Sequence, residues 1–162
     1  MITPTLLADY YARNVNIVKM QIEGLSQADS LIQLPFRANC LNWVVGHIVT
    51  NRLSVLRLLA ARPPFDPGLV SHYERESEPI CEDGPGVLTL EELISLLDQL
   101  QAQIAALLAD ITDEALSREL VFFGSRSRPV SDWLFFFYFH DTYHVGQTEL
   151  LRQAAGKDDK II

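Results

Sequence analysis

Cysteine is scarce in this sequence, which has only Cys40 and Cys81 among its 162 residues. Two cysteines can form at most one bridge, too few for the disulfide framework of a small secreted domain. Neither has a second cysteine at the spacing of a zinc knuckle. We therefore expect both to be reduced thiols, and we interpret Cys40, which has no evident base partner, as structural rather than nucleophilic.

Long apolar runs and basic segments are also missing. The longest apolar run, residues 134–139, is far too short to cross a bilayer, and the first residues lack the basic start and apolar core of a signal peptide. Lysine and arginine number 13 against 21 aspartates and glutamates, which gives a net charge of −8 with no basic cluster. Such a chain repels a phosphate backbone. We expect a cytoplasmic protein with no membrane segment and no nucleic-acid partner.

Helix-forming patterns fill most of the chain. Hydrophobic residues make up 48% of it, enough for one globular domain, residues 1–162, with a sizeable core. The predicted helices cover residues 3–24, 39–61, 89–109 and, from a start at 129–131, the stretch to 155. A helical turn near Thr112 and an extended piece at 121–124 precede the last of them. With no convincing β pattern elsewhere, the fold class is all-α and the architecture a four-helix bundle.

Residues at the predicted helix ends support these boundaries. Thr3, followed by a proline, and Asn39 are the expected N-caps of the first and second helices, and Thr89 with Glu92 forms a capping-box pattern at the start of the third. Residues 62–87 between them are rich in proline, glycine and charge, which predicts a long crossover loop between helices two and three.

Each half of the chain has a long helix, a short Ser- or Thr-led segment and a helix with Trp and His, which indicates a pseudo-repeat.

Three of the four histidines lie on predicted inward-facing stripes. His140 and His144 are four residues apart and share one face of the last helix with Trp133. His47 lies on a mixed stripe of the second helix with Trp43. Either each buried imidazole has its own hydrogen-bond partner, or the three bind one metal ion. Three histidines with an open position are a known catalytic zinc arrangement.

Other polar residues are weaker candidates. His72, in the long loop, is expected on the surface, with a place at the rim of a metal site as the alternative. Asp141 lies about 80° from the histidine stripe, which aims it toward a neighbouring helix rather than a metal ion. Glu149 points away from the histidines and is expected to be a surface charge.

The seven residues 133–139 are apolar on every side of the predicted last helix. Phe135 and Phe139 point away from the histidine stripe, so a single buried face does not account for them. Either several helices of one chain cover this segment, or a second copy covers it in an isologous homodimer. We expect the homodimer.

Two short segments around the histidines resemble one known family. Residues 41–48, LNWVVGHI, and residues 139–147, FHDTYHVGQ, are similar to motifs of the DinB-like, or YfiT-like, superfamily of metal-dependent four-helix-bundle proteins. The resemblance extends over nearly the whole chain. It implies that His47, His140 and His144 bind a divalent metal ion, most commonly nickel or zinc. In the family, one such ligand comes from the second helix and two from the fourth.

The resemblance also implies a reaction class. Characterised relatives include transferases and an isomerase that depend on low-molecular-weight thiols, which implies a small-molecule substrate and a thiol activated at the metal for S-transfer. A metal-activated water and hydrolysis are the alternative chemistry. Two non-enzymatic functions stay open: a bundle with a structural or sensing metal, and a metal-free carrier of a small ligand.

Overall fold

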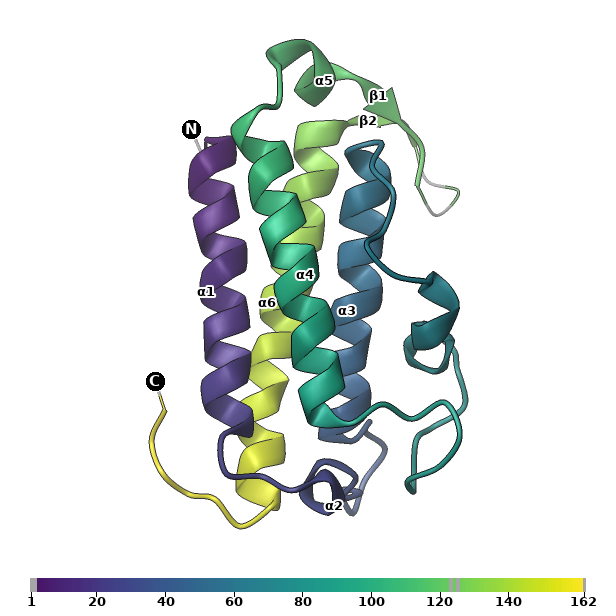
Figure 1. Ribbon diagram of the computed structural model, residues 1–162, viewed down its shortest axis with the longest axis vertical. Coiled ribbons are helices and arrows are strands. Elements are labelled where there is room, and N and C mark those ends of the chain that lie inside the picture. Colours follow the sequence, from purple (N-terminus) through teal and green to yellow (C-terminus); the bar gives the residue numbers. More distant parts are fainter. Residues whose placement is uncertain (1–2, 123, 125, 162) are drawn as a thin grey trace.

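The computed structural model describes residues 3–122, 124 and 126–161, and four long helices form a bundle (Figure 1). These are α1 (Pro4–Ile22), α3 (Leu41–Leu58), α4 (Leu90–Ala109) and α6 (Val130–Ala154). The shorter elements are α2 (Gln27–Ser30), the 3-10 helix η1 (Pro67–Tyr73), α5 (Asp113–Ser117), β1 (Glu119–Leu120) and β2 (Arg128–Pro129). The two strands pair antiparallel, with Glu119 opposite Pro129. The predicted all-α bundle is confirmed.

The order of the helices explains the long loop. In Figure 1, α1 and α6 run down the bundle while α3 and α4 run up it. Helix α6 packs against α1 and α3, and α4 packs against the same two helices from the other side. Because α3 and α4 are parallel neighbours, the chain must return along the full bundle length between them. The predicted crossover loop makes this return, and η1 lies within it.

The helix starts agree with the sequence at two places and differ at a third. Thr3 caps α1, and Thr89 forms the predicted capping box with Glu92 at the start of α4. The expectation that Asn39 caps the second helix is wrong. Helix α3 has Cys40 as its N-cap, without a side-chain cap hydrogen bond. Cys40 is buried and its thiol donates to the Ile80 carbonyl at 3.3 Å, so packing against the loop sets the start of this helix.

The extended segment also lies elsewhere than expected. The strand before the last helix is at residues 119–120 rather than 121–124, and it pairs with residues 128–129. Of the predicted segment, Phe123 lies outside the described residues. The pseudo-repeat is confirmed in the order of elements, because α1, α2 and α3 are matched by α4, α5 and α6.

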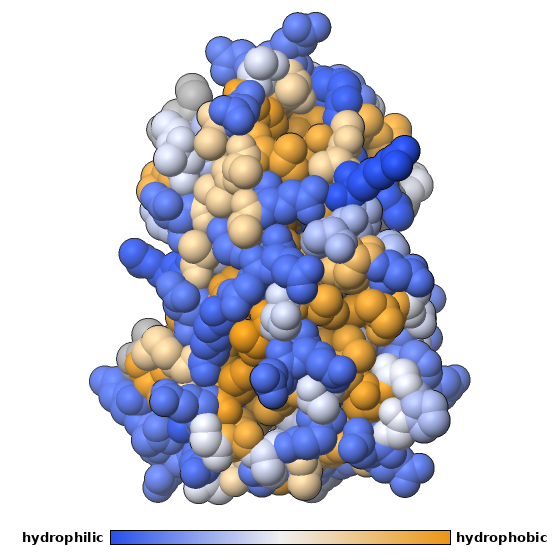
Figure 2. All heavy atoms as spheres, viewed as in Figure 1, coloured by the Kyte–Doolittle hydropathy of each residue, from blue (hydrophilic) through white to orange (hydrophobic). Residues whose placement is uncertain are grey.

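The core lies where the four long helices meet. On α4, one apolar stripe is completely buried and consists of Leu93, Leu97, Leu100 and Ile104. The face of the molecule that carries α4 shows hydrophilic side chains over much of its area, with apolar patches between them (Figure 2). Among the described residues, no helix has both the length and the hydropathy that a membrane crossing requires.

Candidate metal centre

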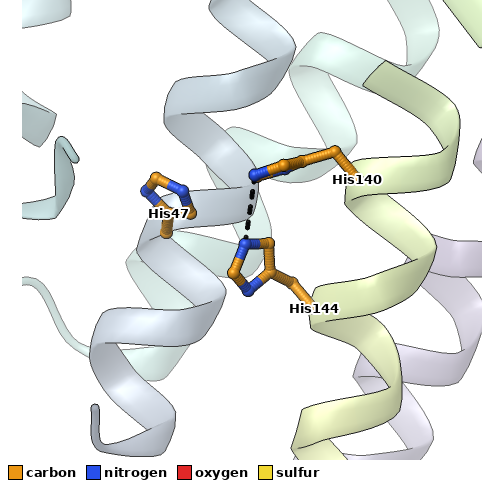
Figure 3. Close-up of side chains that lie close together, drawn as sticks. All are labelled: His47, His140 and His144. Carbon is orange, nitrogen blue, oxygen red and sulfur yellow. Dashed lines mark hydrogen bonds between the residues drawn. The ribbon is translucent and has the colours of Figure 1, made fainter. Parts of the chain in front are cut away.

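The three predicted histidines come together between α3 and α6 (Figure 3). The ring centre of His47 lies 5.5 Å from that of His140 and 4.8 Å from that of His144, and the latter two centres are 4.5 Å apart. One ring nitrogen from each histidine lies within 4.8 Å of the other two. Two antiparallel neighbouring helices thus bring together side chains that are about 90 residues apart in sequence.

Hydrogen bonds orient two of the rings. The Nδ1 atom of His47 lies 2.7 Å from the carbonyl oxygen of Tyr73, which only accepts, so Nδ1 carries the proton and donates. The Nδ1 atom of His144 donates in the same way to Oε1 of Gln147, at 2.7 Å. In both rings Nε2 therefore keeps its lone pair. An imidazole that donates through one nitrogen and offers the other is the usual form of a histidine metal ligand.

The third ring shows that hydrogen bonds alone do not satisfy the cluster. The Nε2 atoms of His140 and His144 face each other at 3.3 Å. The Nδ1 atom of His140 is buried and has no hydrogen-bond partner among the described residues. Tyr73 and Gln147 bond to the nitrogens of His47 and His144 that point out of the cluster. Among the described residues, the nitrogens that point into the cluster therefore have no hydrogen-bond partner outside it. Three neutral ring nitrogens around one point could together hold a metal ion.

Burial keeps these imidazoles neutral. Burial, with a smaller contribution from the neighbouring histidines, lowers the pKa of His47 and that of His140 to about 4. Burial also lowers the pKa of His144, against the opposing effects of the Gln147 hydrogen bond and the Asp141 charge. At neutral pH all three rings are therefore uncharged, which is the form that ligates a metal ion.

The crossover loop reaches His47 through a close contact with α3. The Tyr73 ring is completely buried and packs directly on Gly46, where an added Cβ would overlap the ring. Its hydroxyl donates to Oδ1 of Asn42 at 3.0 Å and accepts from the Leu88 amide at 2.7 Å. These contacts fix the Tyr73 backbone, and with it the carbonyl that orients His47. The sequence analysis missed both Tyr73 and Gly46.

Trp43 supports His47 from the other side. Its ring stacks on the His47 ring with a centre-to-centre distance of 4.5 Å and an angle of 13° between the planes. Its Nε1 donates to the hydroxyl of Ser77 in the loop at 3.0 Å. The stripe shared by Trp43 and His47, predicted from helical spacing, is thus a direct ring contact that also ties the loop to α3.

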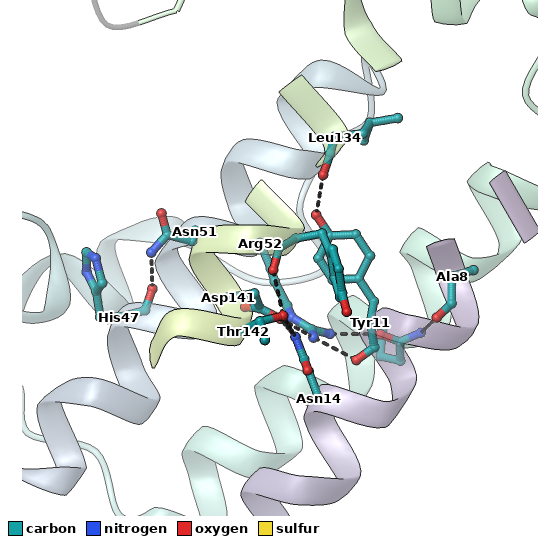
Figure 4. A network of polar contacts seen from close by, with 11 residues as sticks. Ala8, Tyr11, Asn14, His47, Asn51, Arg52, Leu134, Asp141 and Thr142 are labelled. Carbon is teal, nitrogen blue, oxygen red and sulfur yellow. Dashed lines mark hydrogen bonds and ion pairs between the residues drawn. The ribbon is translucent and has the colours of Figure 1, made fainter. Parts of the chain in front are cut away.

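A buried ion pair lies beside the cluster (Figure 4). Arg52 on α3 and Asp141 on α6 are each 1% exposed, and Nη2 lies 2.7 Å from Oδ2. The guanidinium also donates to the Tyr11 carbonyl on α1 and to Oε1 of Gln101 on α4, while Asn14 donates to Asp141. The network therefore joins all four long helices. Sequence reasoning missed Arg52, whose only signal was an isolated arginine in a mostly apolar helix.

The other sequence candidates take peripheral positions. Asp141 contacts a partner helix, as its angle predicted, and does not belong to the group of potential ligand atoms. His72 is exposed on η1 and lies outside that group as well, while Glu149 is exposed on α6. Burial raises the pKa of the Cys40 thiol, which agrees with the structural interpretation of this residue.

A cavity of about 690 Å³ borders the cluster between α3 and the crossover loop. His47 forms part of its wall, together with other residues of α3 and with Ala60, Ala61, Pro63, Pro67, Glu74 and Arg75 beyond this helix. Its volume is within the range of small-molecule sites, roughly 300–1,000 Å³. The cavity therefore has room for a small molecule beside His47.

We predict that Gly46→Ala lowers the affinity for zinc by about tenfold or more, since partners that orient a ligand typically contribute 10–100-fold. The new Cβ displaces the Tyr73 ring and with it the carbonyl bonded to His47. The matched control is Gly146→Ala on α6, where no atom lies within 4 Å of the added Cβ. Equal zinc affinities for the two variants in a competition titration would contradict the role of the Tyr73 contact.

We predict that Asp141→Ala destabilises the fold by about 3–5 kcal/mol, because it leaves the Arg52 charge buried without its counter-ion. Asp98→Ala is the control: it removes an ion pair of similar length, to Lys19, whose side chains are 40% and 50% exposed. That change should cost less than about 1 kcal/mol. Urea unfolding of both variants measures the difference, and equal losses would argue against the importance of the buried pair.

We predict that the metal-free protein loses stability as the pH falls from 6.5 to about 4. In this window the unfolded histidines are protonated, while folded His47 and His140, with a pKa of about 4, stay neutral. The unfolded state then binds more protons, so the free energy of unfolding falls by up to about 1.4 kcal/mol per pH unit for each histidine. His47→Gln should flatten this dependence in urea unfolding, and an unchanged slope would contradict the assignment.

The sequence was compared with protein families and with curated proteins. No curated protein matches the chain. The family model of the DinB superfamily matches residues 13–148, a span that contains His47, His140 and His144 as well as the ion pair of Arg52 and Asp141. Since this match covers most of the sequence, the chain belongs to the DinB superfamily.

Proposed function

We propose that this protein is a metal-dependent enzyme in which His47, His140 and His144 hold one divalent ion, nickel or zinc. The observation that carries the proposal is the convergence of three neutral imidazoles beside a cavity that a small molecule can enter. Membership of the DinB superfamily agrees with it. The substrate is a small molecule, and the reaction is S-transfer from a low-molecular-weight thiol or hydrolysis by water.

The residues of the chain orient the histidine rings and give a substrate access to them. A divalent ion in such a site lowers the pKa of a bound thiol or water and so supplies a nucleophile at neutral pH. Tyr73 and Gln147 hold two of the rings so that Nε2 of each faces inward. The stacked Trp43 ring shields one face of His47. The cavity, which reaches His47 but not the protein core, brings the substrate to this end of the site.

A structural or sensing metal site is the main alternative. Such a site is usually closed by four protein ligands, whereas a catalytic site keeps one position open. Among the described residues, the cluster contains three histidines and no fourth histidine, cysteine or carboxylate. This favours the enzyme over the structural site. Among the described residues, the three inward nitrogens have no hydrogen-bond partner outside the cluster. This favours a metal ion over a metal-free carrier.

The test of thiol activation uses cobalt-substituted protein. Titration with 2-mercaptoethanol should produce a sulfur-to-metal charge-transfer band, because an open position admits the thiolate. His144→Ala should abolish the band, and Cys81→Ser, which removes the exposed thiol of the chain, should leave it unchanged. A cobalt spectrum that no thiol alters would contradict thiol activation and favour the structural site.

We also propose that the protein forms a homodimer through α6. Its outer side carries large exposed apolar residues at spacings of four, four and seven: Phe135, Phe139, Tyr143 and Leu150 are 50%, 60%, 60% and 64% exposed. Phe135 and Phe139 point away from the histidine stripe, whereas the Tyr143 ring borders the cluster, 5.2 Å from the ring centre of His144. A two-fold interface would bury the same stripe of both copies.

We further propose that the protein is cytoplasmic. The free thiols of Cys40 and Cys81 agree with this location.

We predict that Phe135→Lys splits the dimer and leaves zinc affinity within about twofold, because Phe135 lies on the far side of α6 from the histidines. Leu69→Lys is the control, since Leu69 is a similarly exposed apolar residue on η1, 49% exposed. Light scattering coupled to size-exclusion chromatography measures the mass. A wild-type monomer at high micromolar concentration would contradict the dimer.

A further inference from the structure

The cavity beside His47 has a polar wall that continues along α3. The side chains on this wall recur about once per helical turn and belong to His47, Thr50, Asn51, Ser54 and Arg57. Thr50 and Asn51 both donate to the His47 carbonyl, at 2.9 and 2.8 Å, so their polar groups are fixed on this side of the helix. The wall therefore leads from the candidate metal ion to a guanidinium group at the far end.

Two arginines give the cavity positive charge: Arg57 at the end of α3 far from His47, and Arg75 on the loop wall. Arg57 is exposed and has no ion-pair partner among the described residues. Arg75, from the loop, lines the same cavity and has only a 3.6 Å contact with Glu76, in which both side chains are more than 80% exposed. An ion pair that exposed contributes little, so the Arg75 guanidinium is available to a ligand.

The sign of this charge is unusual for the protein. Glu74 is the single acidic residue of the lining, against two arginines, in a chain with a net charge of −8. A cleft whose charge differs in sign from the rest of the surface concentrates small ions of the opposite charge. Arginine also binds carboxylate and phosphate groups through two parallel hydrogen bonds.

The spacing along α3 limits the ligand. Ten residues separate His47 from Arg57, which corresponds to about 15 Å along the helix axis. On the opposite wall, Arg75 follows two residues after Tyr73, whose carbonyl holds the His47 ring. A ligand with a charged group at Arg57 and its other end at His47 must therefore be elongated, and it would pass Arg75 on the loop wall.

We propose that this cavity binds an elongated organic anion, with carboxylate or phosphate groups at Arg57 and at Arg75 and its reactive end at the histidine cluster. The position of the reactive end rests on the proposed metal-dependent function. The positions of the anionic groups rest on the two arginines alone. The two parts can therefore fail separately.

The first experiment compares glutathione with its diethyl ester, which has the same thiol but lacks both carboxylate charges. Glutathione should bind the cobalt-substituted protein about tenfold more tightly, because its carboxylates can form charge-assisted hydrogen bonds with the arginines. In the double variant Arg57→Gln, Arg75→Gln this preference should disappear. Arg13→Gln, which removes an exposed arginine on α1, should keep it. Equal affinities in the wild type would overturn the anion site.

The second experiment does not depend on thiol chemistry. NMR signals of the arginine Nε–H groups are followed while the zinc-loaded protein is titrated with the dicarboxylate glutarate. The signals of Arg57 and Arg75 should shift together to saturation, while that of Arg13 stays in place. If they do so while no thiol alters the cobalt spectrum, the anion site stands and the proposed thiol activation is wrong. If all three arginines shift alike, the binding is unspecific and the anion site is wrong.

Discussion

The register of α3 against α6 determines whether this protein has a metal site at all. His47 faces His140 and His144 only if the two antiparallel helices keep one alignment, and a slip by one turn would move them apart by about 5.4 Å. The ion pair of Arg52 and Asp141 lies in the same two helices and is completely buried. Any slip would leave both charges buried and unpaired, at a cost of several kcal/mol.

The crossover loop completes the site that this register creates. A parallel arrangement of α3 and α4 makes the loop long, and Tyr73 anchors it by filling the space above Gly46. The anchored backbone orients His47, and the following residues form one wall of the cavity. The segment required by the topology therefore also aligns a candidate ligand and shapes the approach to it.

Local patterns predicted a large part of this arrangement. Apolar spacing and the caps at Thr3 and Thr89 located the bundle helices, and helical angles placed His47, His140 and His144 on inward faces. These features depend on residues within one helix. The cap at Asn39 failed because the start of α3 is set by the packing of Cys40 against Ile80, 40 residues away.

The residues that contact the site could not be predicted from local patterns, because they also lie far from it in the sequence. Arg52 pairs with a residue 89 positions away, and the Tyr73 carbonyl that orients His47 is 26 positions away. A backbone carbonyl has no side-chain signature in a sequence. Gly46 and Arg52 were visible as unusual residues in an apolar helix, but only the packed helices and loop give each of them a contact.

The central claim is that three inward Nε2 atoms bind one divalent ion. Zinc binding to protein purified without an affinity tag measures it most directly, by equilibrium dialysis with metal analysis of the wild type and of the His47, His140 and His144 alanine variants. The account predicts one ion per chain in the wild type and a large loss of affinity in each variant, while His72→Ala binds as the wild type does. Stoichiometric binding that survives removal of any one of the three inward histidines would contradict it.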